Sequence, residues 1–318
     1  MRIGIVGFGN LGRALLRVGQ EQGVNITAIV SRRCGKGLEN STRGVPLYHF
    51  DDVARLEGEV DVMLVAGGSA TDLGWMSPEL LEHFNIVDSF DTHSKIDEHL
   101  KRCDRVARMS GHLGILSVGW DPGLLSLFRL YARAVLPDSN ITTVWGKGIS
   151  QGHSDAIRRI DGVADAVQFT VPDEESVASV GKEGFFASPE ALHIRECYVL
   201  PERGADLSLI EDRIKSMPSY FLGYRTVVHF VSEKELSSLR VKMSHRGRVI
   251  ATGRTGGVGH RMDISLELGS NPDFTASVML AYARAAFLLS SRGECGARTV
   301  YDIPPAMLMS GDNDYSLL

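Results

Sequence analysis

The chain has 318 residues, of which 43% are hydrophobic and 23% are charged, and its formal net charge is -5. This length suggests about two domains with a sizeable core. The negative charge and the lack of a basic run exclude a typical nucleic-acid binder. We find no secretory leader and no apolar run of about twenty residues, so we expect a cytoplasmic protein without a membrane partner. The cysteines lack metal-ligand spacing, which predicts reduced thiols and no metal site; they are Cys34, Cys103, Cys197 and Cys295.

The first residues combine a strand with a glycine motif. The apolar run Arg2–Val6 predicts a short strand, and Gly7-x-Gly9-x-x-Gly12 follows it directly. In this pattern Gly7 permits a tight turn, Gly9 lets the backbone approach a pyrophosphate, and Gly12 lets the next helix pack closely on the strand. That helix would present free N–H groups to the phosphates. We therefore expect dinucleotide contacts at Gly7, Phe8, Gly9, Asn10, Leu11 and Gly12.

The residues after the second predicted strand indicate which dinucleotide binds. An amphipathic helix ends at Gly23, a strand follows at Val24–Val30, and Ser31-Arg32-Arg33 comes next. NAD-binding proteins usually place an acid there, which hydrogen-bonds the ribose 2′-hydroxyl and would repel a 2′-phosphate. Guanidinium groups pair with phosphate oxygens instead. The sequence therefore predicts NADP as the cofactor, with Ser31, Arg32 and Arg33 at its 2′-phosphate; a pair of solvated surface arginines is the alternative.

The first third of the chain alternates between strand and helix signals. Apolar runs at Val60–Ala66, Ile86–Ser89 and Ile115–Val118 predict strands, and Lys95–Met109 predicts a helix. Such alternation is typical of an α/β fold with a Rossmann-type doubly wound parallel sheet, whose ligands bind at the carboxyl ends of the strands. The loop after the first of these strands therefore joins the expected cofactor site with Gly68, Ser69, Ala70, Thr71 and Asp72.

The strand pattern changes in the middle of the chain. Longer, alternating strand signals separated by loops rich in Gly, Ser and Asp predict a second, α+β domain with an antiparallel sheet. Its expected strands are Ile141–Val144, Arg195–Leu200, Arg225–Val231 and His260–Leu268. A long helix at Phe274–Ser291 would then return to cover the first sheet. We expect a discontinuous dinucleotide-binding domain, 1–120 and 270–318, and a substrate-binding and dimerisation domain, 121–269.

Longer motifs carry a family resemblance, at Asp88–Thr92, Gly119–Gly123, Trp145–Asp155 and Asn271–Phe274. With them, the chain resembles the meso-diaminopimelate D-dehydrogenases over essentially its whole length. The resemblance implies a homodimer that oxidatively deaminates the D-centre of a small-molecule substrate, meso-2,6-diaminopimelate, with NADP. The products are ammonia and L-2-amino-6-oxopimelate, which cyclises to tetrahydrodipicolinate. The reverse reaction would supply lysine biosynthesis.

Two aspartates are the candidate catalytic residues. Asp91 and Asp121 each follow a predicted strand of the first domain. A carboxylate at such a position can pair with the substrate ammonium and accept a proton. From the residues alone, a helix N-cap at Asp91 and a turn aspartate before Pro122 are equally good explanations. The resemblance assigns both aspartates to the D-centre.

The other substrate residues come from the resemblance. Gln151 and the backbone of Gly152 would bind the D-carboxylate. Arg195 would form a forked pair with the distal carboxylate, helped by Thr170 and His245. From the sequence alone, Arg195 and His245 would be ordinary surface residues. The full set, with two tryptophans as walls and an asparagine at the distal end, is Trp120, Trp145, Gln151, Gly152, Thr170, Arg195, His245 and Asn271.

A few residues stand apart from the family pattern or from the proposed chemistry. His93, Lys95 and Lys147 replace residues that the family pattern leads us to expect, but none of them is a proposed ligand. His153 lies in a Gly-His-Ser-Asp run, where we expect it to cap a helix or orient a loop rather than act as a base.

Other functions are compatible with the glycine motif. One is a different NADPH oxidoreductase of similar build, such as a dihydrodipicolinate reductase or a homoserine dehydrogenase. A second is a D-amino acid dehydrogenase of broad specificity. A third, of another class, is a regulator that binds NADPH without turnover.

Overall fold

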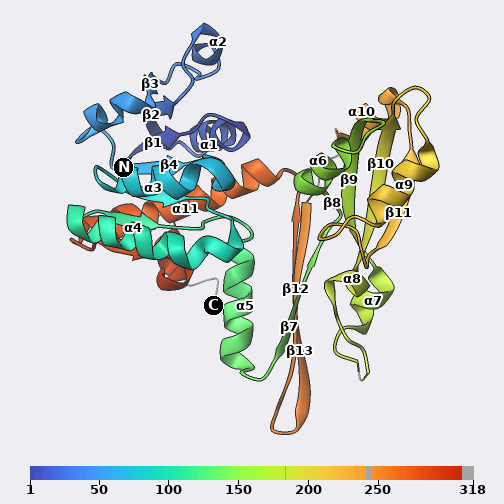
Figure 1. Cartoon of the computed structure of the whole chain (residues 1–318). Helices are drawn as coiled ribbons and strands as arrows, with labels where there is room; N and C mark the ends of the chain where they lie inside the picture. Colours follow the sequence, from blue (N-terminus) through green and yellow to red (C-terminus); the bar gives the residue numbers. More distant parts are fainter. Residues whose placement is uncertain (183, 241–244, 310–318) are drawn as a thin grey trace. The chain divides into compact units, whose positions relative to one another are not determined.

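The structure, a computed structural model, describes residues 1–182, 184–240 and 245–309 (Figure 1). The chain divides into two compact units. Unit 1 comprises Met1–Leu127 and Pro272–Leu318, and unit 2 comprises Phe128–Asn271. The sequence predicts boundaries after residues 120 and 269, whereas the units divide after residues 127 and 271.

Unit 1 is built on a seven-stranded sheet in the order β14-β6-β5-β4-β1-β2-β3, and all of its strand pairs are parallel. Its strands are β1 (Arg2–Val6), β2 (Asn25–Ser31), β3 (Leu47–His49), β4 (Val62–Val65), β5 (Asn85–Asp88), β6 (Leu113–Ile115) and β14 (Gly296–Arg298). Every residue of β4 is buried, as expected when helices cover both faces of a parallel sheet. The predicted doubly wound fold is confirmed.

Helices cover this sheet on both faces (Figure 1). In β4, Val62 and Leu64 pack in one core with α1 and α11, because alternate residues of a strand face opposite sides. Met63 and Val65 pack in the other core with α3 and α4. The helices of unit 1 are α1 (Asn10–Glu21), α2 (Lys36–Glu39), α3 (Gly74–Leu81), α4 (Ile96–Ser110) and α11 (Asn271–Ser291). The helix α5 (Leu124–Val135) begins in unit 1 and continues into unit 2.

The last of these, α11, is the core helix that the sequence predicts. Val278, Tyr282, Ala285 and Leu289 are buried at helical spacing against the sheet of unit 1. By length and composition alone this helix is apolar enough to cross a membrane, although it also carries Asp273 and Arg284. Its buried residues show that the apolar face is used in the core of the protein.

Unit 2 contains two sheets rather than the single antiparallel sheet that the sequence predicts. One has the order β11-β10-β9-β8 and the other β13-β12-β7. The pair β10 and β11 is parallel, so the first sheet is mixed. The strands are β7 (Asn140–Trp145), β8 (Gly148–Ile149), β9 (Val163–Pro172), β10 (His193–Pro201), β11 (Arg225–Phe230), β12 (His245–Thr255) and β13 (Val258–Leu268).

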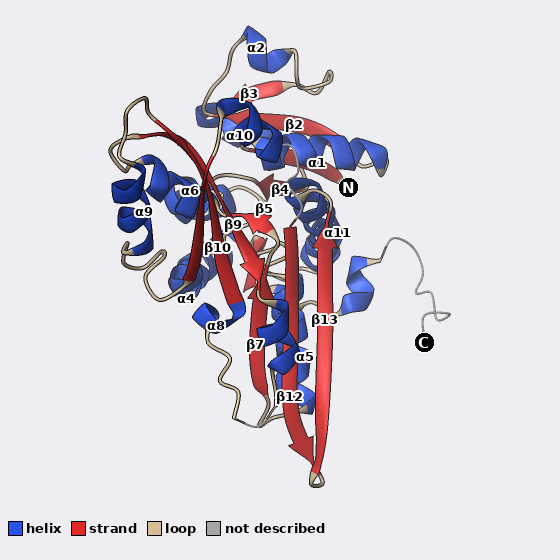
Figure 2. Ribbon diagram, turned by 90° about the vertical axis from the view of Figure 1, so that its right-hand side faces the viewer, coloured by secondary structure: helices blue, strands red, loops and turns tan. Residues whose placement is uncertain are grey.

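A long hairpin and short helices complete unit 2. The strands β12 and β13 pair along their whole length (Figure 2), and the glycines between them, Gly256 and Gly257, have φ of 56° and 81°. Positive φ at both turn residues is what a two-residue hairpin turn of type I′ requires. The helices are α6 (Gln151–Arg158), α7 (Glu174–Ser179), α8 (Pro189–Leu192), α9 (Leu207–Lys215) and α10 (Glu233–Arg240).

Candidate active site

The glycine turn of unit 1 has the geometry of a phosphate-binding loop. Gly7 has φ of 90°, which a side chain rarely adopts. A Cβ on Gly12 would lie 2.0 Å from the Gly7 carbonyl oxygen, so only glycine lets α1 start this close to β1. A Cβ on Gly9 would meet nothing within 4 Å, and α1 has no side-chain N-cap there. The first N–H groups of α1 are therefore open to an anionic ligand.

A cavity of about 520 Å³ adjoins this turn. It lies at the carboxyl ends of the strands, where doubly wound sheets bind their ligands. Its lining combines the turn with the basic residues after β2 and the loop after β4, and includes Gly7, Phe8, Gly9, Ser31, Arg32, Arg33, Gly67, Gly68 and Asp72. The residues present thus fit a dinucleotide.

Arg32 is held in place at the edge of this cavity. Its guanidinium donates a hydrogen bond to the Asp72 carboxylate at 2.6 Å and lies over the Trp75 ring, 5.8 Å from its centre. The Ser31 hydroxyl accepts the backbone N–H of Arg33 at 3.1 Å. Asp72 orients Arg32, and its own negative charge would compete with a phosphate for the same guanidinium.

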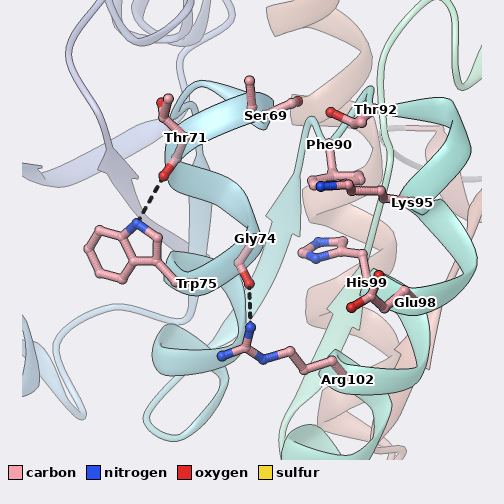
Figure 3. Close-up of a pocket in the computed structure, with 11 residues that line it drawn as sticks. Ser69, Thr71, Gly74, Trp75, Phe90, Thr92, Lys95, Glu98, His99 and Arg102 are labelled. Atoms are coloured by element: carbon pink, nitrogen blue, oxygen red, sulfur yellow. Dashed lines mark hydrogen bonds between the residues drawn. The ribbon is translucent and has the colours of Figure 1, made fainter.

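Three predicted cofactor residues line a second cavity instead. Ser69, Ala70 and Thr71 contribute to a space of about 370 Å³ between α3 and α4 (Figure 3). Asn10 and Leu11 lie in the first turn of α1. The segment after β4 therefore lines the glycine-turn cavity with both of its ends, at Gly68 and Asp72, and the second cavity with the residues between them.

Asp91 lies in the loop after β5 and is exposed. Its backbone N–H donates to the Ser69 hydroxyl at 2.8 Å. Thr92, not Asp91, occupies the N-cap of the short 3-10 helix that follows, and it makes no side-chain cap. The helix-cap alternative for Asp91 therefore does not hold, and its carboxylate is available to a ligand.

Asp121 lies in a tightly folded segment, Gly119–Gly123, and is partly buried. A Cβ on Gly123 would lie 1.9 Å from the Gly119 carbonyl oxygen, so this segment tolerates no side chain at Gly123. The strand predicted at Ile115–Val118 is wrong in its bounds, because β6 ends at Ile115. Ser117 has φ of 57°, in the left-handed region and outside the extended conformation of a strand.

In unit 2, Arg195 and Thr170 are directly opposite each other on β10 and β9. The Arg195 guanidinium donates to the Thr170 hydroxyl at 2.5 Å and lies 4.1 Å from the centre of the Tyr224 ring. Arg195 is only 9% exposed, which corrects the expectation of a surface arginine, and its buried Nε has no hydrogen-bond partner among the described residues. A buried guanidinium with an unused donor is able to bind an anionic group.

Tyr224 was not among the predicted site residues. Its ring covers the Arg195 guanidinium, which keeps one face of that cation away from water. Tyr224 lies just before β11, and nothing in the sequence around it indicates that it meets Arg195 on β10.

The other predicted substrate residues lie in both units. His245 begins β12 and is half-buried, and this burial lowers its pKa. Trp145 is 41% exposed, so it is not a core residue, and its ring stacks on His193. Trp120 is partly buried, Gly152 is exposed in α6, and Asn271 begins α11. The side chain of Gln151 lies outside the described part of the chain.

His153 lies in the first turn of α6 and contacts the residue that caps this helix. Its Nδ1 lies 2.6 Å from the hydroxyl of Ser150, which is the N-cap of α6. The ring meets Tyr220 and Phe221 edge-on, with centres 5.3 and 5.5 Å apart. Burial, and then the charge of Arg195, lower the pKa of His153 from its usual 6.5 to about 4. The imidazole is therefore neutral at neutral pH.

This pKa predicts that stability falls on acidification. Between pH 6.5 and about 4 the unfolded chain binds a proton at this histidine that the folded chain does not. The contribution of His153 to the free energy of unfolding is therefore fully present above pH 6.5 and is lost as the pH falls towards 4. His193 and His245, whose pKa values are also lowered by burial, act in the same direction. We expect a loss of about 1–3 kcal/mol between pH 7 and pH 4.5.

The measurement is the melting temperature from pH 7.5 to pH 4.5 for the parent, for His153→Asn and for His260→Asn. Removing His153 should make the curve flatter. His260 is exposed on β13, so its variant should follow the parent. Parallel curves for all these proteins would show that His153 does not carry the pH dependence.

A doubly wound sheet with an open glycine turn and arginines at its dinucleotide cavity defines a dinucleotide-dependent oxidoreductase. The model of the diaminopimelic acid dehydrogenase C-terminal domain matches residues 119–270. The meso-diaminopimelate D-dehydrogenase of Acetivibrio thermocellus is 47% identical over 313 residues, which are 97% of this chain and 94% of that protein. The chain belongs to the meso-diaminopimelate D-dehydrogenase family.

Solved structures agree with this membership. The diaminopimelate dehydrogenase of C. glutamicum in complex with DAP superimposes with a TM-score of 0.87 at 38% identity, covering 98% of this chain and 96% of that one. An engineered D-amino acid dehydrogenase bound to NADP+ gives a TM-score of 0.81 at 37% identity, covering 100% of this chain and 98% of that one.

Proposed function

We propose that this chain catalyses the NADP-dependent oxidative deamination of the D-centre of meso-2,6-diaminopimelate. The products are ammonia and L-2-amino-6-oxopimelate, which cyclises to tetrahydrodipicolinate, and the reverse direction serves lysine biosynthesis. The observation that carries the proposal is 47% identity over 97% of the chain to an enzyme of that name. The open glycine turn and the buried Arg195 are consistent with it.

The cofactor residues bind and orient. The turn Gly7–Gly12 receives the pyrophosphate at the start of α1, and Ser31, Arg32 and Arg33 receive the 2′-phosphate. When bound, NADP supplies the hydride acceptor for the substrate Cα–H.

At the reacting end, Asp91 and Asp121 hold the ammonium group and accept its proton. Loss of hydride from Cα leaves an iminium, to which water adds before ammonia leaves. Gln151 and the backbone of Gly152 bind the D-carboxylate, and Trp120 and Trp145 limit the access of water. Holding the Cα–H in one orientation is the main contribution that a protein makes to such a step.

At the distal end, Arg195 and Thr170 bind the second carboxylate, with His245 and Asn271 beside them. The contact between Arg195 and Thr170 supports this role, since it leaves a buried guanidinium with an unused donor. Each hydrogen bond to a charged group contributes about 1.5–3 kcal/mol. A monocarboxylate amino acid would leave these groups unpaired, so it would be a poor substrate.

The first test concerns the cofactor. The double variant Arg32→Ala, Arg33→Ala should raise KM for NADP+ about 10- to 100-fold, because it removes charge-assisted hydrogen bonds to the 2′-phosphate. KM for NAD+ should change less than about twofold, since NAD+ lacks that phosphate. Arg55→Ala, at a side chain that is 80% exposed, is the matched control. Equal losses with both cofactors would refute the 2′-phosphate assignment.

The reaction itself is tested by NADP+ reduction with meso-, LL- and DD-diaminopimelate and a panel of D-amino acids. Turnover confined to the meso isomer supports the proposal. Comparable rates with simple D-amino acids would favour a dehydrogenase of broad specificity. Binding of NADPH without any turnover would favour a regulator, and activity only with a dicarboxylate lacking the amine would favour a reductase.

Location and assembly belong to the same proposal. We infer a cytoplasmic homodimer. The four cysteines are all free thiols, as in a reducing compartment, and β13 is a long edge strand whose first residues are exposed, which is a surface suited to pairing. Light scattering of the purified protein measures the mass; a monomer at micromolar concentration would contradict the dimer.

A further inference from the structure

A buried carboxylate joins the segments that carry the proposed catalytic aspartates. Asp88 ends β5 and is 0% exposed. Its Oδ1 accepts the backbone N–H groups of Phe90 at 3.2 Å and of Ser117 at 2.8 Å. Its Oδ2 accepts the hydroxyl of Ser77 at 2.8 Å and lies 2.7 Å from Nε2 of His99. Both oxygens of this carboxylate therefore have two partners, the number that a fully buried carboxylate needs.

The two backbone donors lie where the catalytic segments begin. Phe90 precedes Asp91 directly, and Ser117 starts the segment that leads to Asp121. Ser117 has φ of 57°, an unfavourable conformation for a residue with a side chain. The carboxylate of Asp88 stabilises it through the N–H of Ser117, and the Asp88 carbonyl accepts the next N–H, of Val118, at 2.8 Å. One residue thus determines how both loops leave the sheet.

His99 and Ser77 connect the same carboxylate to the helices. His99 lies on α4, and its ring stacks on Phe90 with centres 4.1 Å apart and planes 13° apart. Figure 3 shows these two rings one above the other on the wall of the second cavity, with Lys95 alongside. Ser77 lies on α3. The loop of Asp91 is therefore held from the sheet by Asp88 and from α4 by the His99 ring.

We propose that Asp88 is a positioning residue for the deamination, with His99 as its partner. It holds the segments of Asp91 and Asp121 in fixed places, so that both carboxylates meet the same ammonium group. The inference rests on the proposed function, which makes these aspartates the ammonium ligands. A displacement of about 1 Å at a reacting centre can cost about 100-fold in rate, so loosening Asp88 should act on turnover without any loss of a substrate contact.

The test compares Asp88→Asn with Asp104→Asn. The first keeps the size of the side chain but places an amide NH2 where an oxygen must accept. Asp104 is the matched control: its carboxylate also accepts a backbone N–H, from Ala297 at 2.9 Å, but it contacts neither catalytic segment. We expect kcat to fall about 30- to 300-fold in Asp88→Asn, with KM for NADP+ within twofold, and to stay within twofold in Asp104→Asn.

Two further readouts separate positioning from general loss of structure. With substrate deuterated at the D-centre, the isotope effect on kcat should rise in Asp88→Asn, because a misplaced amine makes hydride transfer slower than the other steps. Amide hydrogen exchange should become faster in both segments, 89–92 and 117–121, while the glycine turn is unchanged. His99→Gln removes the ring that stacks on Phe90 but leaves a side-chain donor, so kcat should fall less, by about 3- to 10-fold. This variant tests the proposal if Asp88→Asn does not fold.

The outcomes are distinct for the two proposals. If the parent is active but Asp88→Asn and His99→Gln both keep kcat and the isotope effect within twofold of the parent, the inference is overturned. If the parent does not turn over diaminopimelate, the proposed function fails. Hydrogen exchange then decides the positioning role by itself: unchanged exchange in both segments overturns it, and faster exchange in both supports it.

Discussion

Asp121→Asn should lower kcat for meso-diaminopimelate about 100- to 10,000-fold, the range in which a positioned acid or base contributes. Asparagine has nearly the same shape but can neither neutralise the substrate ammonium nor take its proton. Asp121 lies in the tightly folded segment Gly119–Gly123, and the substitution leaves the backbone of that segment unchanged. KM for NADP+ should stay within twofold, since the glycine turn and the arginines are untouched.

Steady-state NADP+ reduction measures this effect, with circular dichroism and NADPH binding as evidence that the variant is folded. Asp51→Asn makes the same chemical change at a side chain that is 84% exposed in unit 1, and it should leave kcat unchanged. Turnover of Asp121→Asn within threefold of the parent would remove Asp121 from the reaction.

The fold of unit 1 is predictable from the sequence because its signals are local. The run Arg2–Val6 is a strand in the structure, and Gly7 and Gly12 each have a reason for being glycine within a few residues of themselves. The apolar residues of α11 likewise recur at helical spacing, so their burial follows from the pattern.

The end of β6 shows where local signals fail. Val118 is apolar and buried, so the sequence extends the strand to it, but the chain turns at Ser117. The cause is the carboxylate of Asp88, which belongs to the neighbouring strand. No window around Ser117 contains that information.

The same reason explains unit 2. Arginine is usually exposed, so the residue type alone predicts that Arg195 lies at the surface. The pairing of β10 with β9 instead places it opposite Thr170, and the Tyr224 ring covers it. The parallel pairing of β10 with β11 is also set by the register of distant segments. The roles assigned to Arg195, His245 and Asn271 therefore came from family resemblance, and their chemistry stays a proposal.

Arg195→Met should lower kcat/KM for meso-diaminopimelate about 10- to 100-fold or more, since it removes charge-assisted hydrogen bonds worth about 1.5–3 kcal/mol each. Methionine has a similar length and can remain under the Tyr224 ring, so the pocket keeps its volume while it loses its charge. For a D-alanine-like monocarboxylate, which has no distal carboxylate to lose, kcat/KM should change less than threefold. The ratio of the two specificities is the quantity to measure.

Two companion variants make that ratio decisive. Arg195→Lys keeps a charge but not the fork of donors, so it should retain part of the preference for diaminopimelate. Arg225→Met is the control, because Arg225 lies opposite Ile194 on the neighbouring strand but its side chain is 70% exposed. If Arg195→Met lowered kcat/KM equally for both substrates, the loss would be one of structure or of the reacting end, and Arg195 would not be the ligand of the distal carboxylate. A buried anion site of this geometry predicts that kcat/KM falls for diaminopimelate only. The fall should be smaller in Arg195→Lys than in Arg195→Met, and absent in Arg225→Met.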